Sequence, residues 1–326
     1  MLGRRTTLQG LAALIAAPSA FAQSGFSFAG KNVKLVVAYA VGGVADITTR
    51  LSTTNLASAL GASSVVVENK AGANGNIGTE YVARQPADGL TYLIGPSSLL
   101  TMNHLVPELR IRSLDVTAQL VPVVPLADTT LALVVPANSD VRTIEQFLAK
   151  ARSTQIRFGN PSGGTPHHLA GLVFERANKL DFVHVPYKGG APMIADLAGG
   201  HIDACFSSIS SAEPLVKQGK LRWVAVLHSR GQQSWRGISS VSPWMQDAVI
   251  PSWTGIFAPL GTPADAIRQV NAAVSTALQT PATASRLEDL GLDPLPMSTA
   301  QMQDRLNKES QFMKQFLNQV KLEFNS

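Results

Sequence analysis

Two diglycine turns, each lying between an expected strand and an expected helix, are the features of this sequence with the clearest chemical potential. Gly42-Gly43 follows the apolar run Val33–Val37, and Gly163-Gly164 follows the short run Arg157–Gly159. Glycine permits a tight turn, and the first N–H groups of a helix have no acceptor within the helix. Together with the helix dipole, such N–H groups form a site for an anion. Both turns therefore predict the binding of a carboxylate.

The residues after each turn have the pattern of a helix. After the first turn apolar residues recur at roughly helical spacing, at Ile47, Leu51, Leu56 and Leu60. Gly61 is placed to end that helix, while Thr165 is a suitable N-cap and Pro166 a suitable first residue of the second helix. Either turn alone has an ordinary strand-to-helix connection as its alternative reading. Two such turns together suggest two lobes that close on one ligand from opposite sides.

Composition and motifs exclude several other classes of protein. The chain has 326 residues, of which 45% are hydrophobic and 15% charged, and this length predicts two domains. It contains no phosphate-binding loop, no zinc-protease motif, no dinucleotide fingerprint after the first strand and no nucleophile elbow. His167 and His168 are adjacent, so they diverge on a helix and make a poor metal pair; one of them is expected to cap the helix or to pack. We predict no catalytic residues, no metal and no cofactor.

The N-terminus has the pattern of an export signal. Arg4-Arg5 precede the apolar run Leu8–Ala20, which at 13 residues is too short to span a bilayer. A small-residue cleavage site ends at Ala22, and the paired arginines also fit twin-arginine export. Removal of residues 1–22 takes away two arginines and no acid, so the formal charge falls from +5 to +3. That charge, without runs of one sign, gives no reason to expect nucleic-acid binding. Cys205 is the only cysteine, and we expect it to be a buried thiol.

Alternating strand and helix patterns predict an α/β protein with a parallel sheet. Two β-rich segments, Leu120–Val135 and Trp253–Pro259, bracket a middle section with strand and helix alternation of its own. This layout predicts a two-lobed protein of the type II periplasmic binding (Venus flytrap) class with two hinge-crossing β segments. Lobe 1 would comprise residues 26–130 and 254–326, and lobe 2 residues 131–253. Two independent domains in tandem are the alternative.

Several blocks in a fixed order resemble one family. The blocks are Val66–Gly78, Ala87–Thr91, His184–Gly189, Asp196–Asp203 and Ala258–Pro263. Together they resemble the extracytoplasmic solute receptors of tripartite tricarboxylate transporters, also called the Bug family, and the resemblance covers essentially the whole mature chain. It implies a periplasmic, two-lobed binding protein that captures a small carboxylate and passes it to membrane permease subunits. It also implies that backbone amides and bridging waters at Tyr39–Asp46 and Asn160–Thr165 hold the carboxylate.

From the residues and the resemblance together we predict the ligand site. Backbone donors are expected from Gly42, Gly43, Gly163, Gly164 and Thr165. The remaining lining is expected from Tyr39, Val41, Ser97, Ser98, Ser162 and Asp203. Asp46 is expected to steady its helix and loop, and would become a partner for a ligand amine. A turn-anchoring role is the alternative for Asp203, and Val41 and His167 depart from the usual family pattern.

The predicted protein is a non-catalytic receptor that acts as a monomer in the periplasm. Two other functions stay open at this point. The receptor could present its ligand to a membrane sensor kinase in place of a permease, which neighbouring genes would distinguish. A hydrolase or lyase on the same fold would need a reactive base and nucleophile, and turnover of a bound carboxylate would reveal it.

Overall fold

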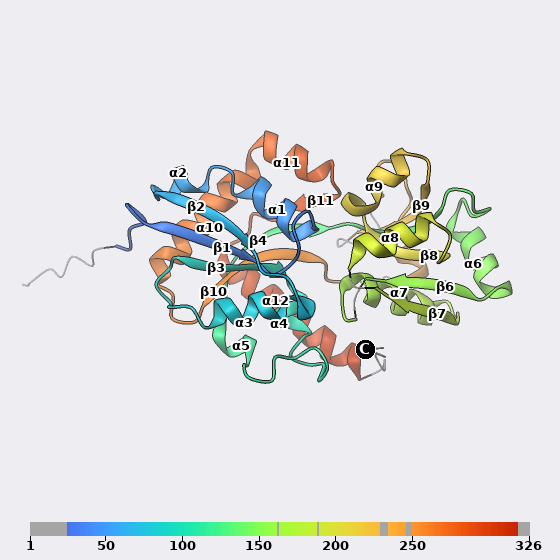
Figure 1. The fold of residues 1–326 in the computed structure, drawn as a ribbon, viewed down its shortest axis with the longest axis horizontal. Helices are drawn as coiled ribbons and strands as arrows, with labels where there is room; N and C mark the ends of the chain where they lie inside the picture. Colours follow the sequence, from blue (N-terminus) through green and yellow to red (C-terminus); the bar gives the residue numbers. More distant parts are fainter. Residues whose placement is uncertain (1–24, 162, 188, 229–233, 246–249, 319–326) are drawn as a thin grey trace, which may run out of the picture.

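Two β-sheets organise the molecule in the computed structural model, which describes residues 25–161, 163–187, 189–228, 234–245 and 250–318 (Figure 1). We call the part that contains the six-stranded sheet lobe 1. Its strands lie in the order β11 (Leu292–Pro294), β4 (Leu120–Thr129), β10 (Trp253–Pro259), β3 (Thr91–Pro96), β1 (Asn32–Val37) and β2 (Ser64–Asn69). Lobe 2 contains the five-stranded sheet. Its strands lie in the order β7 (Phe182–Pro186), β6 (Ile156–Asn160), β8 (Ala204–Ser208), β5 (Leu131–Pro136) and β9 (Leu221–Leu227).

Each sheet is mixed, and the parallel sheet predicted from the first half of the chain is present in β1, β2 and β3. In lobe 1, β1 pairs in parallel with β2 and β3, whereas β10 runs antiparallel to β3 and β4. In lobe 2, β6 is parallel to β7 and β8, whereas β5 is antiparallel to β8 and β9. The antiparallel strands are the ones next to the crossings between lobes. β5 follows directly from lobe 1, and β10 follows the segment that comes from lobe 2.

Helices cover both faces of each sheet (Figure 1). Lobe 1 has the helices α1 (Val44–Ser52), α2 (Leu56–Leu60), η1 (Ala73–Gly75), α3 (Asn76–Ala83), α4 (Ser98–Thr101), α5 (Val116–Gln119), α10 (Ala264–Gln279), α11 (Pro281–Glu288) and α12 (Thr299–Leu317). Lobe 2 has the helices α6 (Ile144–Ser153), α7 (Pro166–Ala177), α8 (Gly190–Ala198), α9 (Ile209–Lys217) and η2 (Ser242–Met245). None of the helices in the described ranges is both long and apolar enough to cross a membrane.

Alternation along the strands explains why both faces are covered. In β1, Leu35 and Val37 pack into one apolar cluster and Val36 into another on the opposite face. In β8, Phe206 and Cys205 divide in the same way, Phe206 into a cluster that also includes Met313 of α12 and Cys205 into a cluster on the opposite face. Strands that bury both faces read as continuous apolar runs, which is why the sequence reveals them. The expected burial of Cys205 is confirmed, and burial raises the pKa of its thiol.

The helix expected from the first turn to Gly61 is interrupted. The structure divides it into α1 and α2, with a turn at residues 53–55 between them. Threonine hydroxyls donate to carbonyls four residues earlier, as Thr49 does to Ala45 and Thr53 to Thr49. Such hydroxyls compete for the helix carbonyls and favour an early end. Gly61 does end α2, with a left-handed φ of 65°.

The two lobes meet where β4 is followed directly by β5. Between these strands, the Thr130 N–H donates to the carbonyl of Gly291 in lobe 1 at 2.8 Å. Side chains also join the lobes here: His228, after β9, pairs with Asp293 of β11 at 2.7 Å between His228 Nε2 and Asp293 Oδ2. These contacts fix the lobes against each other along one edge. The two glycine turns lie at the carboxyl ends of β1 and β6, which face the junction between the lobes (Figure 1).

Candidate ligand-binding site at the two glycine turns

The first turn begins α1 with the backbone geometry that its glycines allow. Gly42 has a φ of 76°, in the left-handed region that side chains other than glycine rarely adopt. Gly43 is the N-cap residue in an extended conformation, and α1 starts at Val44. In Figure 1, α1 lies at the edge of lobe 1 nearest to lobe 2. The predicted turn and its position on the carboxyl rim of the sheet are therefore present.

The amides that this turn presents are not the two predicted ones. The Gly42 N–H donates to Asp46 Oδ2 at 3.0 Å, and the Gly43 N–H donates to the carbonyl of Ala40 at 3.2 Å. Both glycine amides are thus occupied within the turn. The next two amides, of Val44 and Ala45, belong to the first helical turn and have no acceptor among the described residues. The amides without an acceptor among the described residues therefore lie two residues after the glycines that were predicted as donors.

Asp46 holds this turn in place. Its Oδ1 also accepts from Asn69 Nδ2 at 3.0 Å and pairs with Arg50 Nη2 at 2.9 Å. Burial of Asp46 opposes its ionisation, but the hydrogen bonds from Arg50, Gly42 and Asn69 outweigh burial and keep its pKa below the usual value. The carboxylate is 2% exposed and already accepts from three residues. Asp46 therefore positions the turn, and it has little capacity left for an amine on a ligand.

Tyr39 and the serines after β3 lie on the same rim, because β1 and β3 are neighbouring parallel strands. The Tyr39 hydroxyl donates to the carbonyl of Asn74 at 3.0 Å, so it ties the first turn to the glycine-rich loop after β2. Ser97 is 1% exposed, and its Oγ has no hydrogen-bond partner among the described residues. Ser98 is also buried, whereas Val41 at the tip of the turn is 72% exposed. The predicted lobe 1 residues are thus brought to one end of the sheet.

The second turn repeats the arrangement with different chemistry. Gly164 has a φ of 73°, and its N–H donates to Nδ1 of His168 at 3.2 Å. Thr165 is the N-cap of α7, as predicted, and its Oγ1 accepts from the His168 N–H at 3.4 Å. Pro166 occupies the first helical position and has no N–H. Gly163 is half-buried, and Ser162 lies outside the described residues.

His168 is the neutral counterpart of Asp46. It is 3% exposed and lies edge-on to the ring of His184, with ring centroids 5.7 Å apart. Burial, with a smaller contribution from His184, lowers the pKa of His168 to about 4. The ring is therefore neutral at pH 7, so its Nδ1 can accept the Gly164 N–H. The predicted backbone donor Gly164 is occupied by this contact, as Gly42 is in lobe 1.

His167 is the residue of this turn that sequence reasoning undervalued. Its backbone N–H, in the first turn of α7, has no acceptor among the described residues. Its ring Nδ1 is buried and also has no partner. Burial lowers the pKa of His167 to about 4, so this ring is neutral as well. In the sequence His167 stands out only as a poor metal ligand beside His168, or as a residue that caps or packs. Nothing there indicates that its neutral ring could donate or accept a hydrogen bond at this turn.

Asp203 lies at the opposite end of the lobe 2 sheet from the second glycine turn. It precedes β8, and its carboxylate accepts from the Arg157 N–H at 2.8 Å and pairs with Arg157 Nη2 at 2.9 Å. Arg157 lies near the start of β6, whereas the glycine turn follows the other end of that strand. The carboxylate therefore anchors the beginnings of two parallel strands, which is the alternative reading.

The carboxyl end of β8 brings a serine that the sequence analysis did not single out. Ser208 is the N-cap residue of α9 and is 1% exposed. Its Oγ lies 2.7 Å from Oγ of Ser211. Since β8 is parallel to β6, Ser208 and the second glycine turn lie at the same end of the lobe 2 sheet. The rule that ligands bind beyond the carboxyl ends of strands points to Ser208 and not to Asp203.

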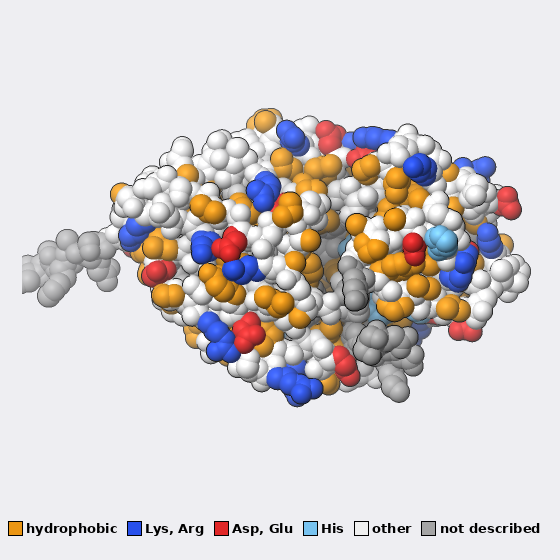
Figure 2. All heavy atoms as spheres, viewed as in Figure 1, with side chains coloured by type: hydrophobic (Ala, Val, Ile, Leu, Met, Phe, Trp, Pro, Cys, Tyr) orange, Lys and Arg blue, Asp and Glu red, His pale blue; other side chains and the backbone are white. Residues whose placement is uncertain are grey.

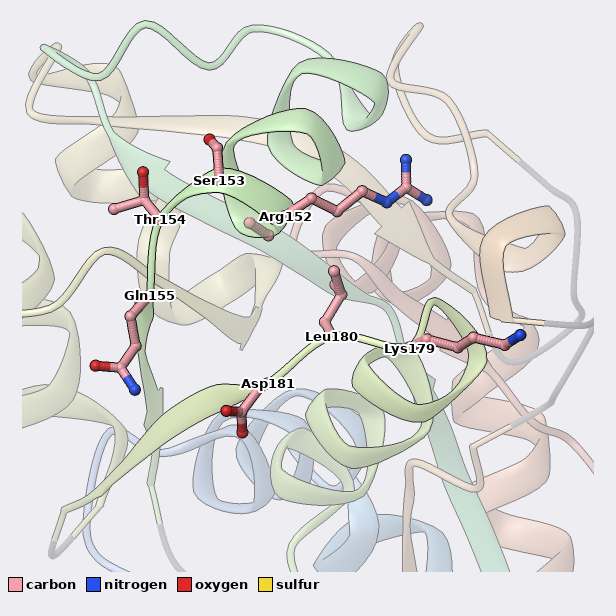
Figure 3. Close-up of a pocket in the computed structure, with 8 residues that line it drawn as sticks. Arg152, Ser153, Thr154, Gln155, Lys179, Leu180 and Asp181 are labelled. Carbon is pink, nitrogen blue, oxygen red and sulfur yellow. The ribbon is translucent and has the colours of Figure 1, made fainter.

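The surface is hollowed where the two lobes meet (Figure 2). A different, shallow hollow of about 370 Å³ lies at the outer end of lobe 2, between the end of α6 and the start of β7 (Figure 3). There Arg152 and Lys179 extend to one side, while Gln155 and Asp181 extend to the other (Figure 3). Side chains that do not converge on one point make a poor binding site. The arrangement at the glycine turns is the better candidate.

Fold and site together define a class of protein, a two-lobed α/β solute-binding protein. The model of the tripartite tricarboxylate transporter family receptor matches residues 48–322. The chain belongs to this family, as the sequence blocks predict. It is 29% identical to the UPF0065 protein in the tcbD-tcbE intergenic region of Pseudomonas sp. (strain P51), over 99% of this chain and 96% of that protein.

Solved structures agree with this assignment. R. palustris Rpa4515 with adipate is 28% identical and has a TM-score of 0.81, over 88% of this chain and 96% of that one. MatC (Rpa3494) from Rhodopseudomonas palustris with bound malate is 26% identical and has a TM-score of 0.70, over 87% of this chain and 98% of that one. The predicted Venus flytrap fold is confirmed. The chain is a solute-binding receptor of the periplasmic type.

Proposed function

We propose that this receptor binds a small organic carboxylate between its lobes and delivers it to the permease of a tripartite tricarboxylate-type transporter. The observation that carries the proposal is the pair of glycine turns, each of which leaves first-turn amides without an acceptor on the rim between the lobes. The two similar structures solved with adipate and malate support a carboxylate as the ligand. The family supports a permease as the partner.

At both turns, backbone amides and not cationic side chains would attract the anion. Unpaired N–H groups at the start of a helix combine with the helix dipole to stabilise negative charge. In lobe 1 the charge of Asp46 is balanced by Arg50, at 2.9 Å, so it does not leave a net negative charge on the turn. In lobe 2 the corresponding partner, His168, is neutral. Amides therefore supply the attraction in both lobes.

The chain organisation is proposed on the same basis. Residues 1–22 would be an export signal that is cleaved near Ala22, and they lie outside the described residues. Lobe 1 would comprise residues 26–130 and 254–326, and lobe 2 residues 131–253. The direct succession of β4 in one sheet and β5 in the other, across Thr130, supports the first boundary. We further propose that the mature protein works as a monomer in the periplasm.

A thermal-shift screen tests the carboxylate proposal. The mature protein is heated with adipate and malate, and with the diamides of the same acids as matched uncharged controls. A ligand that binds only the folded state, at about 100 times its Kd, raises the unfolding free energy by about 2.7 kcal/mol. We expect a rise for at least one acid and none for its diamide. Equal shifts for acid and diamide would contradict the proposal. So would the absence of a shift with these acids and with a wider panel of small carboxylates, measured after unfolding and refolding to remove any bound ligand.

A further inference from the structure

Two adjacent histidines at the start of α7 have opposite surroundings. His168 Nδ1 accepts the Gly164 N–H at 3.2 Å and thereby closes the glycine turn. His167 Nδ1 is buried and has no hydrogen-bond partner, and the His167 backbone N–H has no acceptor among the described residues. One histidine thus completes the turn. The other brings two unsatisfied hydrogen-bonding groups to the same end of the helix.

An unsatisfied buried nitrogen is costly. Leaving a buried polar atom without a partner costs roughly 1–3 kcal/mol, and native proteins satisfy the great majority of such atoms. Eight side-chain atoms of the described residues are in this condition. In the first turn of α7 His167 Nδ1 is such an atom, and Ser97 Oγ, directly after β3 in lobe 1, is another. A partner that arrives with the ligand would satisfy both.

Covalent geometry keeps both groups of His167 close to the start of α7. The first N–H groups of a helix point out of its N-terminus. Side chains on a helix lean toward the N-terminus and lie over the preceding turn. The backbone nitrogen and ring Nδ1 of one histidine are separated by four covalent bonds. A carboxylate seated at the turn can therefore place one oxygen at the N–H and the other at the ring.

We propose that His167 is a specificity-determining residue that binds one carboxylate of the ligand at two points, through its backbone N–H and its ring Nδ1–H. This inference rests on the proposed function and assigns a role within that site. The ring is neutral at pH 7, because burial lowers its pKa to about 4, and so it recognises the acceptor and not the charge alone. Two donors require two acceptor oxygens. A carboxylate fits this requirement, whereas a primary amide presents an N–H₂ group to one of the donors.

The test uses an isosteric pair of variants. His167→Asn keeps a polar atom where Nδ1 was, and His167→Leu has the same shape without that atom. The ligand affinities of wild type and both variants for adipate and malate are measured by titration calorimetry. Loss of one hydrogen bond predicts about tenfold weaker binding by His167→Leu, and binding within about threefold of wild type by His167→Asn. Ser275→Ala is a control at another position, since Ser275 Oγ in α10 is also buried without a partner among the described residues.

Each result has one meaning. Unchanged affinity in His167→Leu would overturn the inference and leave the carboxylate receptor standing. An equal loss in both variants would assign the effect to ring shape and would also overturn it. If wild type binds neither acid nor any other carboxylate, the proposed function itself fails. Should a variant not fold, the ¹⁵N resonances of the His167 ring decide: a shift of Nδ1 on addition of the acid supports the contact, and no shift overturns it.

Discussion

The two lobes use the same backbone device at the site, but they complete it with side chains of opposite character. In lobe 1 the amide of Gly42 donates to the carboxylate of Asp46, four residues later. In lobe 2 the amide of Gly164 donates to the imidazole of His168, also four residues later. Each contact fixes a left-handed glycine against the first turn of a helix. Each also leaves the following helix amides for a ligand.

The difference lies in charge and in what supports it. Asp46 is ionised and belongs to a polar network with Arg50 and Asn69, which also ties the Tyr39 carbonyl. His168 is neutral and packs against His184. The charge of Asp46 is balanced by Arg50 at 2.9 Å, whereas the neutral His168 needs no counter-ion. The comparison teaches that lobe 1 holds its turn through a charged network and lobe 2 through a neutral contact.

The largest effect is expected from breaking the lobe 1 network. Asp46→Ala removes the acceptor of the Gly42 N–H and leaves Asn69 and Arg50 without their common partner. We expect the free energy of unfolding to fall by about 3 kcal/mol, because several polar groups lose their hydrogen bonds at once. Ligand affinity should fall more than tenfold, because the turn is no longer held. Denaturant unfolding and calorimetry measure the two effects.

Asp46→Asn is the control for that experiment. The amide oxygen of asparagine can still accept the Gly42 N–H, while the negative charge is lost. If the account is right, this variant keeps the turn, loses about 1 kcal/mol of stability and binds the acid at least as well as wild type. Equal damage from both substitutions would show that charge, and not the hydrogen bond to the turn, is what matters at Asp46.

Acid should loosen the two turns at different pH. The pKa of His168 is about 4 in the folded protein and near 6.5 in the unfolded chain, so the unfolded state binds the extra proton between these values. The stability that neutral His168 contributes is therefore fully present above pH 6.5 and is lost as the pH falls toward 4. At pH 5 this loss is about 2 kcal/mol. The pKa of Asp46 is lowered in the folded protein. The stability that its ionised form contributes is therefore present above the usual pKa of an aspartate, and it is lost only as the pH falls through the lowered pKa.

His168→Asn separates the two contributions. Asparagine offers an acceptor near the position of Nδ1 but does not titrate. Chemical unfolding at pH 8 and pH 5 should show a smaller loss of stability for this variant than for wild type. A variant that loses as much stability as wild type over that range would disprove the assignment of the acid effect to His168.

The sequence predicts the architecture well, because its signals are local. The apolar run Leu35–Val37 marks β1, and the Thr165-Pro166 pair marks the start of α7. The direction of the strands next to the hinge is not encoded by a local signal. It depends on how the chain returns from lobe 2 into β10, which runs antiparallel to β3 and β4. Propensity also misses the break between α1 and α2, where threonine hydroxyls take helix carbonyls.

The site is predicted only in outline for a similar reason. A diglycine turn at a strand end identifies the place where an anion would bind. It does not reveal that Asp46 and His168 occupy the glycine amides, because those contacts depend on side-chain direction in the first helical turn. Asp203 is expected near the site because it adjoins a strand, but that expectation does not take into account at which end of the strand it lies. Its carboxylate lies at the amino end of β8.

The smallest effect is expected at Ser97. Its Oγ is buried without a partner in the free protein, so Ser97→Ala should leave the free energy of unfolding within about 1 kcal/mol of wild type. If the hydroxyl meets the ligand from lobe 1, as His167 does from lobe 2, the affinity for the acid should fall about fivefold. Calorimetry measures it, and an unchanged affinity would remove Ser97 from the site and leave the lobe 1 contribution to the amides of α1.

The most direct test of the two-turn account follows the backbone amides themselves. Proton–nitrogen correlation spectra of mature protein labelled at glycine, valine, alanine and histidine are recorded during titration with the acid that binds. The account predicts large downfield amide proton shifts at Val44, Ala45 and His167, which receive the carboxylate, and small ones at Gly42 and Gly164, which are already bonded within their turns. Large shifts at the two glycines, with Val44, Ala45 and His167 unchanged, would contradict it.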